Sequence, residues 1–135
     1  MSPHPASPAA LRERLPANPT LDDLRAAIAG LSFAVLVTDQ HGSYVAANAA
    51  ACRLTGFAEA ELLRMAVPDL TADTDEGVSD VLWRAFREQG VQAGEYTLAR
   101  KDGSPIVVRY EALANILPGY HASFLTRVRG RQRAR

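Results

Sequence analysis

Apolar and polar residues alternate with two different periods along this chain. Between Leu21 and Leu31 the apolar residues recur every three or four positions, which predicts an amphipathic helix over residues 20–31. Thr20 and Asp23 form a capping-box-like start for this helix. The pattern is compatible with packing on the chain's own domain or on another chain. The apolar stripe consists of Leu21, Leu24, Ala27, Ile28 and Leu31.

Short elements are predicted in the next part of the chain. The turn sequence Asp39-Gln40-His41-Gly42 lies between two short apolar runs, which predicts a hairpin. Asn48 is a favourable N-cap for the helix that follows, and Gly56 is suited to end that helix in the left-handed conformation. The expected elements are strands over 34–38 and 43–46, short helices over 49–54 and 58–65, and a longer helix over 76–89.

The last third of the chain has the period-two alternation of strands. An Asp-Gly turn at Lys101-Asp102-Gly103-Ser104 separates two such runs, and Pro118-Gly119 makes the next turn. The strands are expected over 92–100, 105–114 and 120–128. The order of two strands, several helices and three strands predicts an α+β domain with an antiparallel sheet and helices packed on one face.

The chain has 135 residues, enough for one domain with tails. Five of its eight prolines lie in residues 1–19, which predicts a mostly disordered tail with at most a helical turn near residues 11–15. We therefore expect a tail over 1–19, an amphipathic helix over 20–31, a folded domain over 32–128 and a basic tail over 129–135.

A net charge of zero conceals an uneven distribution. Residues 1–126 carry 15 acidic and 10 basic residues, whereas the last nine residues carry five arginines and no acid. Only the tail is suited to contact nucleic acid, and a solvated linker is the simpler interpretation. No apolar run reaches the ~20 residues of a membrane helix, and no signal peptide is present, so we expect a cytoplasmic protein.

The order of elements and the turn residues resemble the PAS (Per-Arnt-Sim) sensor family over about Leu31 to Val128. The later motif of that family, Arg-Lys-Asp-Gly-Ser, is present as Arg100–Ser104. The earlier motif matches at Val37-Thr38-Asp39, Gly42, Asn48, Ala50, Leu54-Thr55-Gly56-Phe57 and Glu61-Leu62. Each piece is weak alone, but together and in this order they are specific.

The resemblance implies a five-stranded antiparallel sheet with short helices and one longer helix on its inner face. In some PAS domains a pocket beneath the helices holds haem, flavin or a small organic molecule. In others the core is filled, and the domain serves dimerisation or signal relay. We expect the filled or nearly filled core here, with no catalytic activity, since fold alone does not imply chemistry.

Residues that could hold a cofactor are sparse. In light-sensing PAS domains the flavin-reactive cysteine follows the second short helix, but the matching segment Arg64–Leu70 has no cysteine and Cys52 lies elsewhere. Haem-binding members supply a histidine from the long helix, which here has none, and His121 is in a strand. We expect neither flavin nor haem, no metal site and no catalytic motif.

Two sets of candidate residues follow from the resemblance and the periodicity. The inner face under the long helix would line an apolar ligand pocket with two tyrosines. Its expected lining is Leu82, Phe86, Tyr96, Leu98, Val108, Tyr110 and Phe124. A homodimer interface is expected at Leu21, Leu24, Ile28, Leu31 and Trp83.

The expected function is a PAS sensory or interaction module that dimerises and passes a signal to an effector such as a histidine kinase or regulator. The alternative is a sensor whose pocket holds a small ligand or cofactor. A third, from a different class, is nucleic-acid contact through the arginine-rich tail. The usual exit motif of effector-coupled PAS domains, Asp-Ile-Thr, is absent near Arg127-Val128-Arg129.

Overall fold

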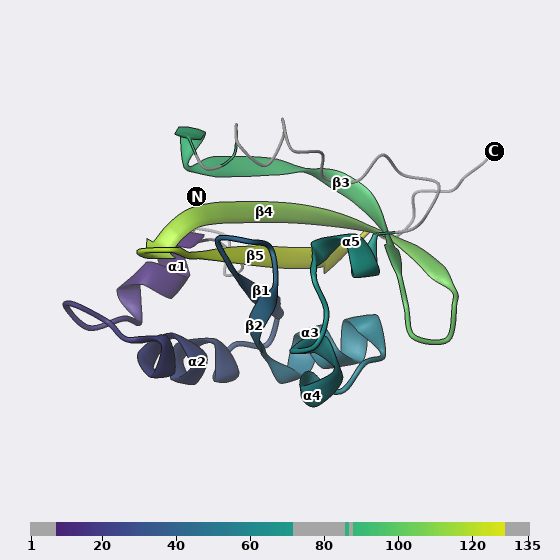
Figure 1. Ribbon diagram of the computed structural model, residues 1–135, viewed down its shortest axis with the longest axis horizontal. Helices are drawn as coiled ribbons and strands as arrows, with labels where there is room; N and C mark the ends of the chain where they lie inside the picture. Colours follow the sequence, from purple (N-terminus) through teal and green to yellow (C-terminus); the bar gives the residue numbers. More distant parts are fainter. Residues whose placement is uncertain (1–7, 72–85, 87, 129–135) are drawn as a thin grey trace.

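The computed structural model describes residues 8–71, 86 and 88–128. Its centre is a five-stranded antiparallel sheet with the strand order β2-β1-β5-β4-β3 (Figure 1). The strands are β1 (Ala34–Asp39), β2 (Tyr44–Ala47), β3 (Val91–Ala99), β4 (Pro105–Leu117) and β5 (Tyr120–Arg127). The five strands and several short helices confirm the predicted α+β fold.

Five short helices have both ends within the described residues, and no helix there is long and apolar enough to cross a membrane. They are α1 (Pro8–Glu13), α2 (Leu21–Ala29), α3 (Ala49–Thr55), α4 (Glu59–Leu62) and α5 (Val67–Leu70). Most of the longer helix predicted over 76–89 lies outside the described residues. Pro68 lies in the first turn of α5, where a backbone N–H would have no intrahelical hydrogen-bond acceptor.

The two faces of the sheet bury two separate apolar clusters. On the face covered by α3, α4 and α5, here called the inner face, the buried residues include Leu36, Leu62, Leu70, Leu98, Val108 and Leu125. On the opposite, outer face they include Leu11, Leu24, Ile28, Val35, Leu113 and Phe124. The outer cluster joins α1 and α2 to the same chain's sheet.

The N-terminal tail is more ordered than the prolines predict. Residues 8–13 form α1, which contacts β4 and lies against the ends of β4 and β5 in Figure 1. Leu11 is completely buried in the outer cluster. The expectation of disorder is therefore wrong for this part, because burial of one leucine against the sheet stabilises a turn that the local sequence does not. Residues 1–7 lie outside the described part.

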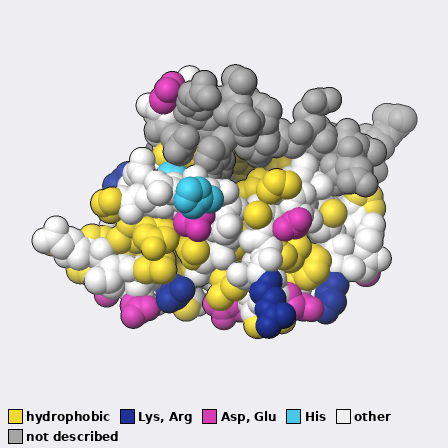
Figure 2. Space-filling model, in the orientation of Figure 1, with side chains coloured by type: hydrophobic (Ala, Val, Ile, Leu, Met, Phe, Trp, Pro, Cys, Tyr) yellow, Lys and Arg dark blue, Asp and Glu magenta, His cyan; other side chains and the backbone are white. Residues whose placement is uncertain are grey.

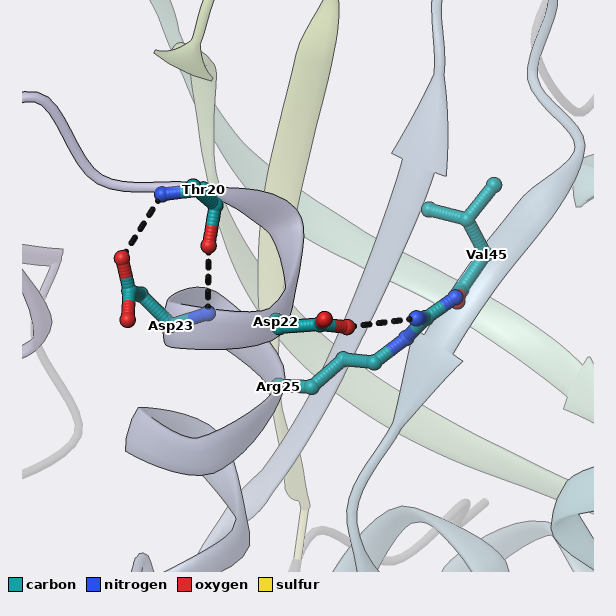
Figure 3. Close-up of polar contacts among 5 residues, drawn as sticks. All are labelled: Thr20, Asp22, Asp23, Arg25 and Val45. Atoms are coloured by element: carbon teal, nitrogen blue, oxygen red, sulfur yellow. Dashed lines mark hydrogen bonds and ion pairs between the residues drawn. The ribbon is translucent and has the colours of Figure 1, made fainter.

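The amphipathic helix is present as α2, but its stripe faces its own domain. The predicted capping box is formed: Thr20 Oγ1 accepts from the Asp23 N–H at 3.1 Å and Asp23 accepts from the Thr20 N–H at 2.9 Å (Figure 3). Leu24 and Ile28 are 0% and 1% exposed in the outer cluster, which Leu31 also joins. Assigning these three residues to a dimer interface was wrong, because β1 and β5 offer an apolar face that buries the stripe within the chain.

The two motifs of the family resemblance meet in space. The backbone N–H of Lys101, in the β3–β4 turn, donates to the carbonyl of Thr55 at the end of α3, at 3.0 Å. The Lys101 Nζ also lies 2.7 Å from the Glu61 carboxylate on α4, and this contact lowers the pKa of Glu61. Two segments far apart in sequence are thereby joined at one corner of the inner face.

Asn48 links four segments through one buried amide. Its Oδ1 accepts from the N–H groups of Val35 and Ala51, at 3.1 and 3.0 Å. Its Nδ2 donates to the carbonyl oxygens of Ile28 and Phe33, at 3.0 and 2.8 Å. Both donors and both acceptor positions of the amide are used, and the residue is 3% exposed. The end of α2, the following loop, β1 and α3 are held in one arrangement.

Asn48→Asp should destabilise the fold although aspartate is an equally good N-cap. The substitution keeps the acceptor for Ala51 but removes both donors and places a carboxylate beside two carbonyl oxygens. We expect a loss of about 3 kcal/mol in the free energy of unfolding, measured by urea denaturation. The exposed cap substitution Thr20→Ala is the control and should cost about 1 kcal/mol. An Asn48→Asp chain as stable as the parent would contradict this role.

Candidate functional site on the inner face of the sheet

The centre of the inner face is filled by side chains of the chain itself. Leu98 on β3 and Val108 on β4 are fully buried, and Leu125 on β5 is 3% exposed. The short helices supply the opposite side with Ala51, Leu62 and Leu70, all fully buried in the same cluster. The predicted positions of Leu98 and Val108 on one apolar face agree with the strand register.

Two tyrosines lie side by side at the β3–β4 part of this face. The rings of Tyr96 and Tyr110 meet edge to face, with centroids 5.6 Å apart. Tyr110 stands opposite Gly94 in the register, and a Cβ at Gly94 would lie 3.3 Å from its ring. Glycine at this strand position therefore leaves room for the Tyr110 ring to lie across β3.

This placement brings the Tyr110 hydroxyl to the side chain of Gln92. The hydroxyl donates to Gln92 Oε1 at 3.1 Å. Neither Gln92 nor Gly94 was singled out from the sequence. A glycine inside a strand was the available signal, because it often marks a close approach of another group.

Burial changes the acid–base behaviour of three tyrosines. Desolvation is the main cause that raises the pKa of Tyr44 well above its usual value, and neighbouring Tyr96 and Asp69 raise it further. The pKa of Tyr96 is also raised by burial and then by Tyr110, and that of Tyr110 by burial alone. At neutral pH these groups are phenols able to donate a hydrogen bond.

His121 and Phe86 lie at another part of the inner face. Their rings meet edge to face with centroids 5.4 Å apart, and Phe86 is 4% exposed. His121 Nδ1 accepts a hydrogen bond from the Asn115 N–H at 2.9 Å, so the proton of the neutral ring is on Nε2. A metal-binding imidazole uses the opposite arrangement, with one N–H donating outward and the other nitrogen free to ligate. His121 in this state does not fit an iron ligand.

Phe124 was assigned to the wrong face of the sheet. The register pairs Tyr110 with Leu125 and Glu111 with Phe124, so Leu125 faces inward and Phe124 outward. The Phe124 ring packs near Phe33 in the outer cluster, with centroids 5.6 Å apart. The reason is that β5 is buried on both faces. Its polar residues His121 and Ser123 share the inner face with Leu125, so polarity does not show which face is turned inward.

The remaining residues considered from the sequence contribute no group to the inner face that could hold a ligand or metal within the described part of the chain. Leu82 and Trp83 lie outside the described residues, and Leu21 is half-buried beside the outer cluster. Cys52 on α3 is partly buried, and burial is the first cause that raises the pKa of its thiol. Within the described ranges no group of three or more His, Cys, Asp or Glu side chains could hold a metal ion.

The raised pKa values of the buried tyrosines predict that the free energy of unfolding falls at alkaline pH. A group whose pKa is raised by folding contributes stability below its unfolded pKa, near 10, and that stability is lost as the pH rises towards the folded pKa. We expect tyrosinate absorbance of the folded chain to show fewer than four ionising tyrosines at pH about 11. Tyr96→Phe should reduce the fall in unfolding free energy above pH about 10. Four tyrosines ionising together near 10 in the folded protein would contradict the burial of Tyr44 and Tyr96.

Gly94→Ala should displace the Tyr110 ring and break its hydrogen bond to Gln92. The added methyl meets the ring at 3.3 Å, closer than an ordinary contact, and the ring can rotate away. We expect about 1 kcal/mol of destabilisation and a shift of the Tyr110 ring resonances by NMR. Gly103→Ala, in the exposed turn at a positive φ, is the control, since it strains the backbone without touching Tyr110. Unchanged Tyr110 resonances in Gly94→Ala would show that the ring does not depend on this glycine.

Comparison with known proteins agrees with this architecture. No curated protein sequence matches the chain. A PAS domain from a two-component sensor histidine kinase superposes with a TM-score of 0.66 at 17% identity, covering 80% of this chain and 96% of that domain. A PAS domain from Colwellia psychrerythraea gives 0.69 at 21% identity, over 82% and 98%. A LOV protein from Rhodobacter sphaeroides gives 0.70 at 16% identity, over 84% and 70%.

At these identities the similar structures show the fold alone. The family model for the PAS fold, however, matches residues 22–126, which is most of the chain and includes both faces of the sheet. The chain belongs to the PAS family.

Proposed function

We propose that this chain is a PAS signalling module that acts by contacting a protein partner, with its core filled by its own side chains. The observation that supports this best is the burial of Leu98, Val108 and Leu125 beneath Leu62 and Leu70. A large planar cofactor needs an open cavity at this place. Here the short helices occupy the centre of the inner face themselves.

The surface suited to a partner is the part of the outer face that α1 and α2 leave uncovered. Val91 and Val107 are 59% and 41% exposed there, although they are large apolar residues. Glu95 and Arg109 are paired across the two strands, 3.4 Å apart. We call this surface the open half of the outer face: Val91, Ala93, Glu95, Val107, Arg109 and Glu111. Apolar residues with charged neighbours are typical of a protein contact.

The partner we propose is a signalling effector such as a sensor histidine kinase or a regulator, or a second copy of the chain. Similar structures include a PAS domain from a two-component sensor histidine kinase. The expected role is sensory and not enzymatic. An interaction through the open half of the outer face would place the partner on the side of the sheet away from Tyr96 and Tyr110.

The alternative is a small ligand at the β3 part of the inner face. Tyr110 and Gln92 offer a donor, an acceptor and an aromatic ring in partly buried positions. LOV domains among the similar structures bring flavin into consideration. The segment Arg64–Leu70 contains no cysteine to react with it, so these residues do not fit covalent flavin chemistry.

Nucleic-acid contact is the weakest proposal. In Figure 2 basic and acidic side chains lie next to one another along the lower edge of the described surface, and the basic ones form no large separate patch there. Such mixed charge does not favour a phosphate backbone. The arginine tail 129–135 lies outside the described residues, and its contact with nucleic acid stays a prediction.

Native mass spectrometry and an absorbance spectrum of the freshly purified chain test the proposal. We expect masses equal to the polypeptide or its multiples and no absorbance band beyond that of the aromatic residues, because side chains of the described residues are packed together at the centre of the inner face. Tyr110→Phe is the matched variant for a ligand at the β3 part of the face. A stoichiometric extra mass that Tyr110→Phe weakens, or a visible chromophore, would overturn the filled core and favour the ligand-binding alternative.

A further inference from the structure

The strand β4 contains an irregularity near its end. The pairing of β4 with β5 shifts register between Leu113 and Leu117, and Asn115 within this stretch has a φ of 57°. The two residues that follow Asn115, Ile116 and Leu117, are both buried in the outer cluster. Regular alternation would turn one of these two side chains to the inner face. The irregularity, here called the β4 bulge, therefore places both of them on the outer side.

A histidine on the neighbouring strand supplies a hydrogen-bond acceptor to the β4 bulge. The Asn115 N–H donates to His121 Nδ1 at 2.9 Å, and the Gly119 N–H donates to Asn115 Oδ1 at 3.1 Å. A backbone N–H at a bulge is left out of the regular ladder, so a side chain can take the place of the missing carbonyl. The bulge is thus tied to the inner face, where His121 lies, 3% exposed.

This hydrogen bond requires the neutral form of the imidazole. Only a ring nitrogen that carries no proton can accept, so Nδ1 is unprotonated and the proton of the neutral ring is on Nε2. A second proton taken from solvent can bind only to Nδ1. The charged ring would then point an N–H at the N–H of Asn115, and the hydrogen bond would be lost. Because Asn115 itself is exposed, water can solvate its N–H once the bond is broken.

The described side chains that surround the ring are uncharged at neutral pH. The Phe86 ring meets His121 edge to face, with centroids 5.4 Å apart. Thr38 on β1 stands opposite His121 in the register, Tyr44 on β2 stands opposite Thr38, and both are buried. Burial raises the pKa of the Tyr44 phenol, so this group is also neutral. An imidazolium gains no counter-charge from these three neighbours.

The charged side chains on the nearby elements are turned to solvent or to their own turn. Asp39, next to Thr38, accepts hydrogen bonds from the N–H groups of His41 and Ser43. The other charged residues on β4, β5, α5 and the described residues before β3 are exposed: Asp69, Glu88, Arg109, Glu111 and Arg127. The described surroundings therefore favour the neutral ring.

We propose that His121 is an acid-sensitive switch, which loosens the β4 bulge when its imidazole takes up a proton. The proton binds to Nδ1, the Asn115 N–H loses its acceptor, and Ile116 and Leu117 pack less firmly in the outer cluster. The same cluster buries Leu11 of α1, which contacts β4 and lies where β4 passes into β5 (Figure 1). A fall in pH is thereby passed from the inner face to the N-terminal helix. This response goes beyond the proposed partner contact and requires neither a partner nor a ligand.

The direction of the pH effect follows from the state of the ring in the folded chain. Folding favours the neutral imidazole, because the charged form would be buried and would break its hydrogen bond to Asn115. The contribution of this bond to the free energy of unfolding is therefore complete above the ordinary histidine pKa of about 6.5 and is lost as the pH falls below it.

NMR spectra of the full chain between pH about 5 and 8 test the switch. We expect the amide resonance of Asn115 to shift at the same pH as the ring resonances of His121. Hydrogen exchange of this amide, corrected for the intrinsic effect of pH, should become about ten-fold faster on acidification. The methyl resonances of Leu117 and Leu11 should shift together with it. A ring that titrates while the Asn115 amide or these leucines stay unchanged, or one that stays neutral throughout, would overturn the proposal.

A histidine-to-asparagine variant separates the proton from the hydrogen bond. His121→Asn places a neutral oxygen near the position of Nδ1 and does not titrate in this range. We expect it to keep the neutral-pH resonance of the Asn115 amide and to lose the response to acid. His41→Asn, in the exposed β1–β2 turn, is the matched control and should respond as the parent does.

The switch is refuted if the Asn115 amide of the His121→Asn chain still responds to acid, or if His41→Asn abolishes the response. Should His121→Asn fail to fold, the parent spectra decide by themselves, because they follow the same amide and the same leucines without any substitution. A bound ligand or a protein partner found by native mass spectrometry would bear on the proposed function only.

Discussion

The buried amide of Asn48 is the interaction on which the arrangement of this domain depends. It is the N-cap of α3, but it also serves the first residues of β1 and the end of α2. A serine or aspartate could cap the helix, yet neither has two donors to satisfy the carbonyl oxygens of Ile28 and Phe33. Because these backbone groups are removed from water, leaving them without partners would be more costly than losing the cap itself.

Asn48 also fixes the helices on one face of the sheet relative to those on the other face. The helices α1 and α2 cover part of the outer face, and α3, α4 and α5 cover the inner face. The amide lies at the junction, where the chain passes from α2 to β1 and from β2 to α3. Coverage of both faces confines exposed apolar residues on the sheet to its β3–β4 part, where Val91 and Val107 lie. The location of the proposed partner surface thus follows from which strands the N-terminal helices reach.

The inner face combines a tightly packed centre with a polar margin. Leu98 and Val108 are fully buried at the centre, whereas Tyr110 and Gln92 form a hydrogen-bonded pair toward the edge strand. Gly94 permits this pair, since any side chain there would meet the Tyr110 ring. Burial raises the pKa of the tyrosine hydroxyl groups, so they remain neutral donors at any physiological pH. The two proposed functions would use different parts of this face. A signal passed through packed side chains would involve the apolar centre, whereas a small polar ligand would bind at the Tyr110–Gln92 pair.

The sequence alone determined the features that depend on neighbouring residues. The capping box at Thr20, the N-cap at Asn48 and the left-handed end of α3 at Gly56 involve residues within a few positions of one another. Asp39 likewise accepts hydrogen bonds from residues two and four positions on, as the turn sequence predicts. Strand alternation placed Val108 and Tyr110 on a common face for the same local reason.

Only the tertiary structure decided which face or partner each apolar residue meets. In β5 both faces are buried, so the period of two was evident but its phase was not, and Phe124 faces outward. An amphipathic helix must bury its apolar stripe, but its sequence does not show against which surface. Leu24 and Ile28 pack on the sheet of their own chain. The prolines around α1 disfavour local order, yet contact with a distant strand buries Leu11. Each outcome depends on a non-local contact, whose free energy is absent from any short window of sequence.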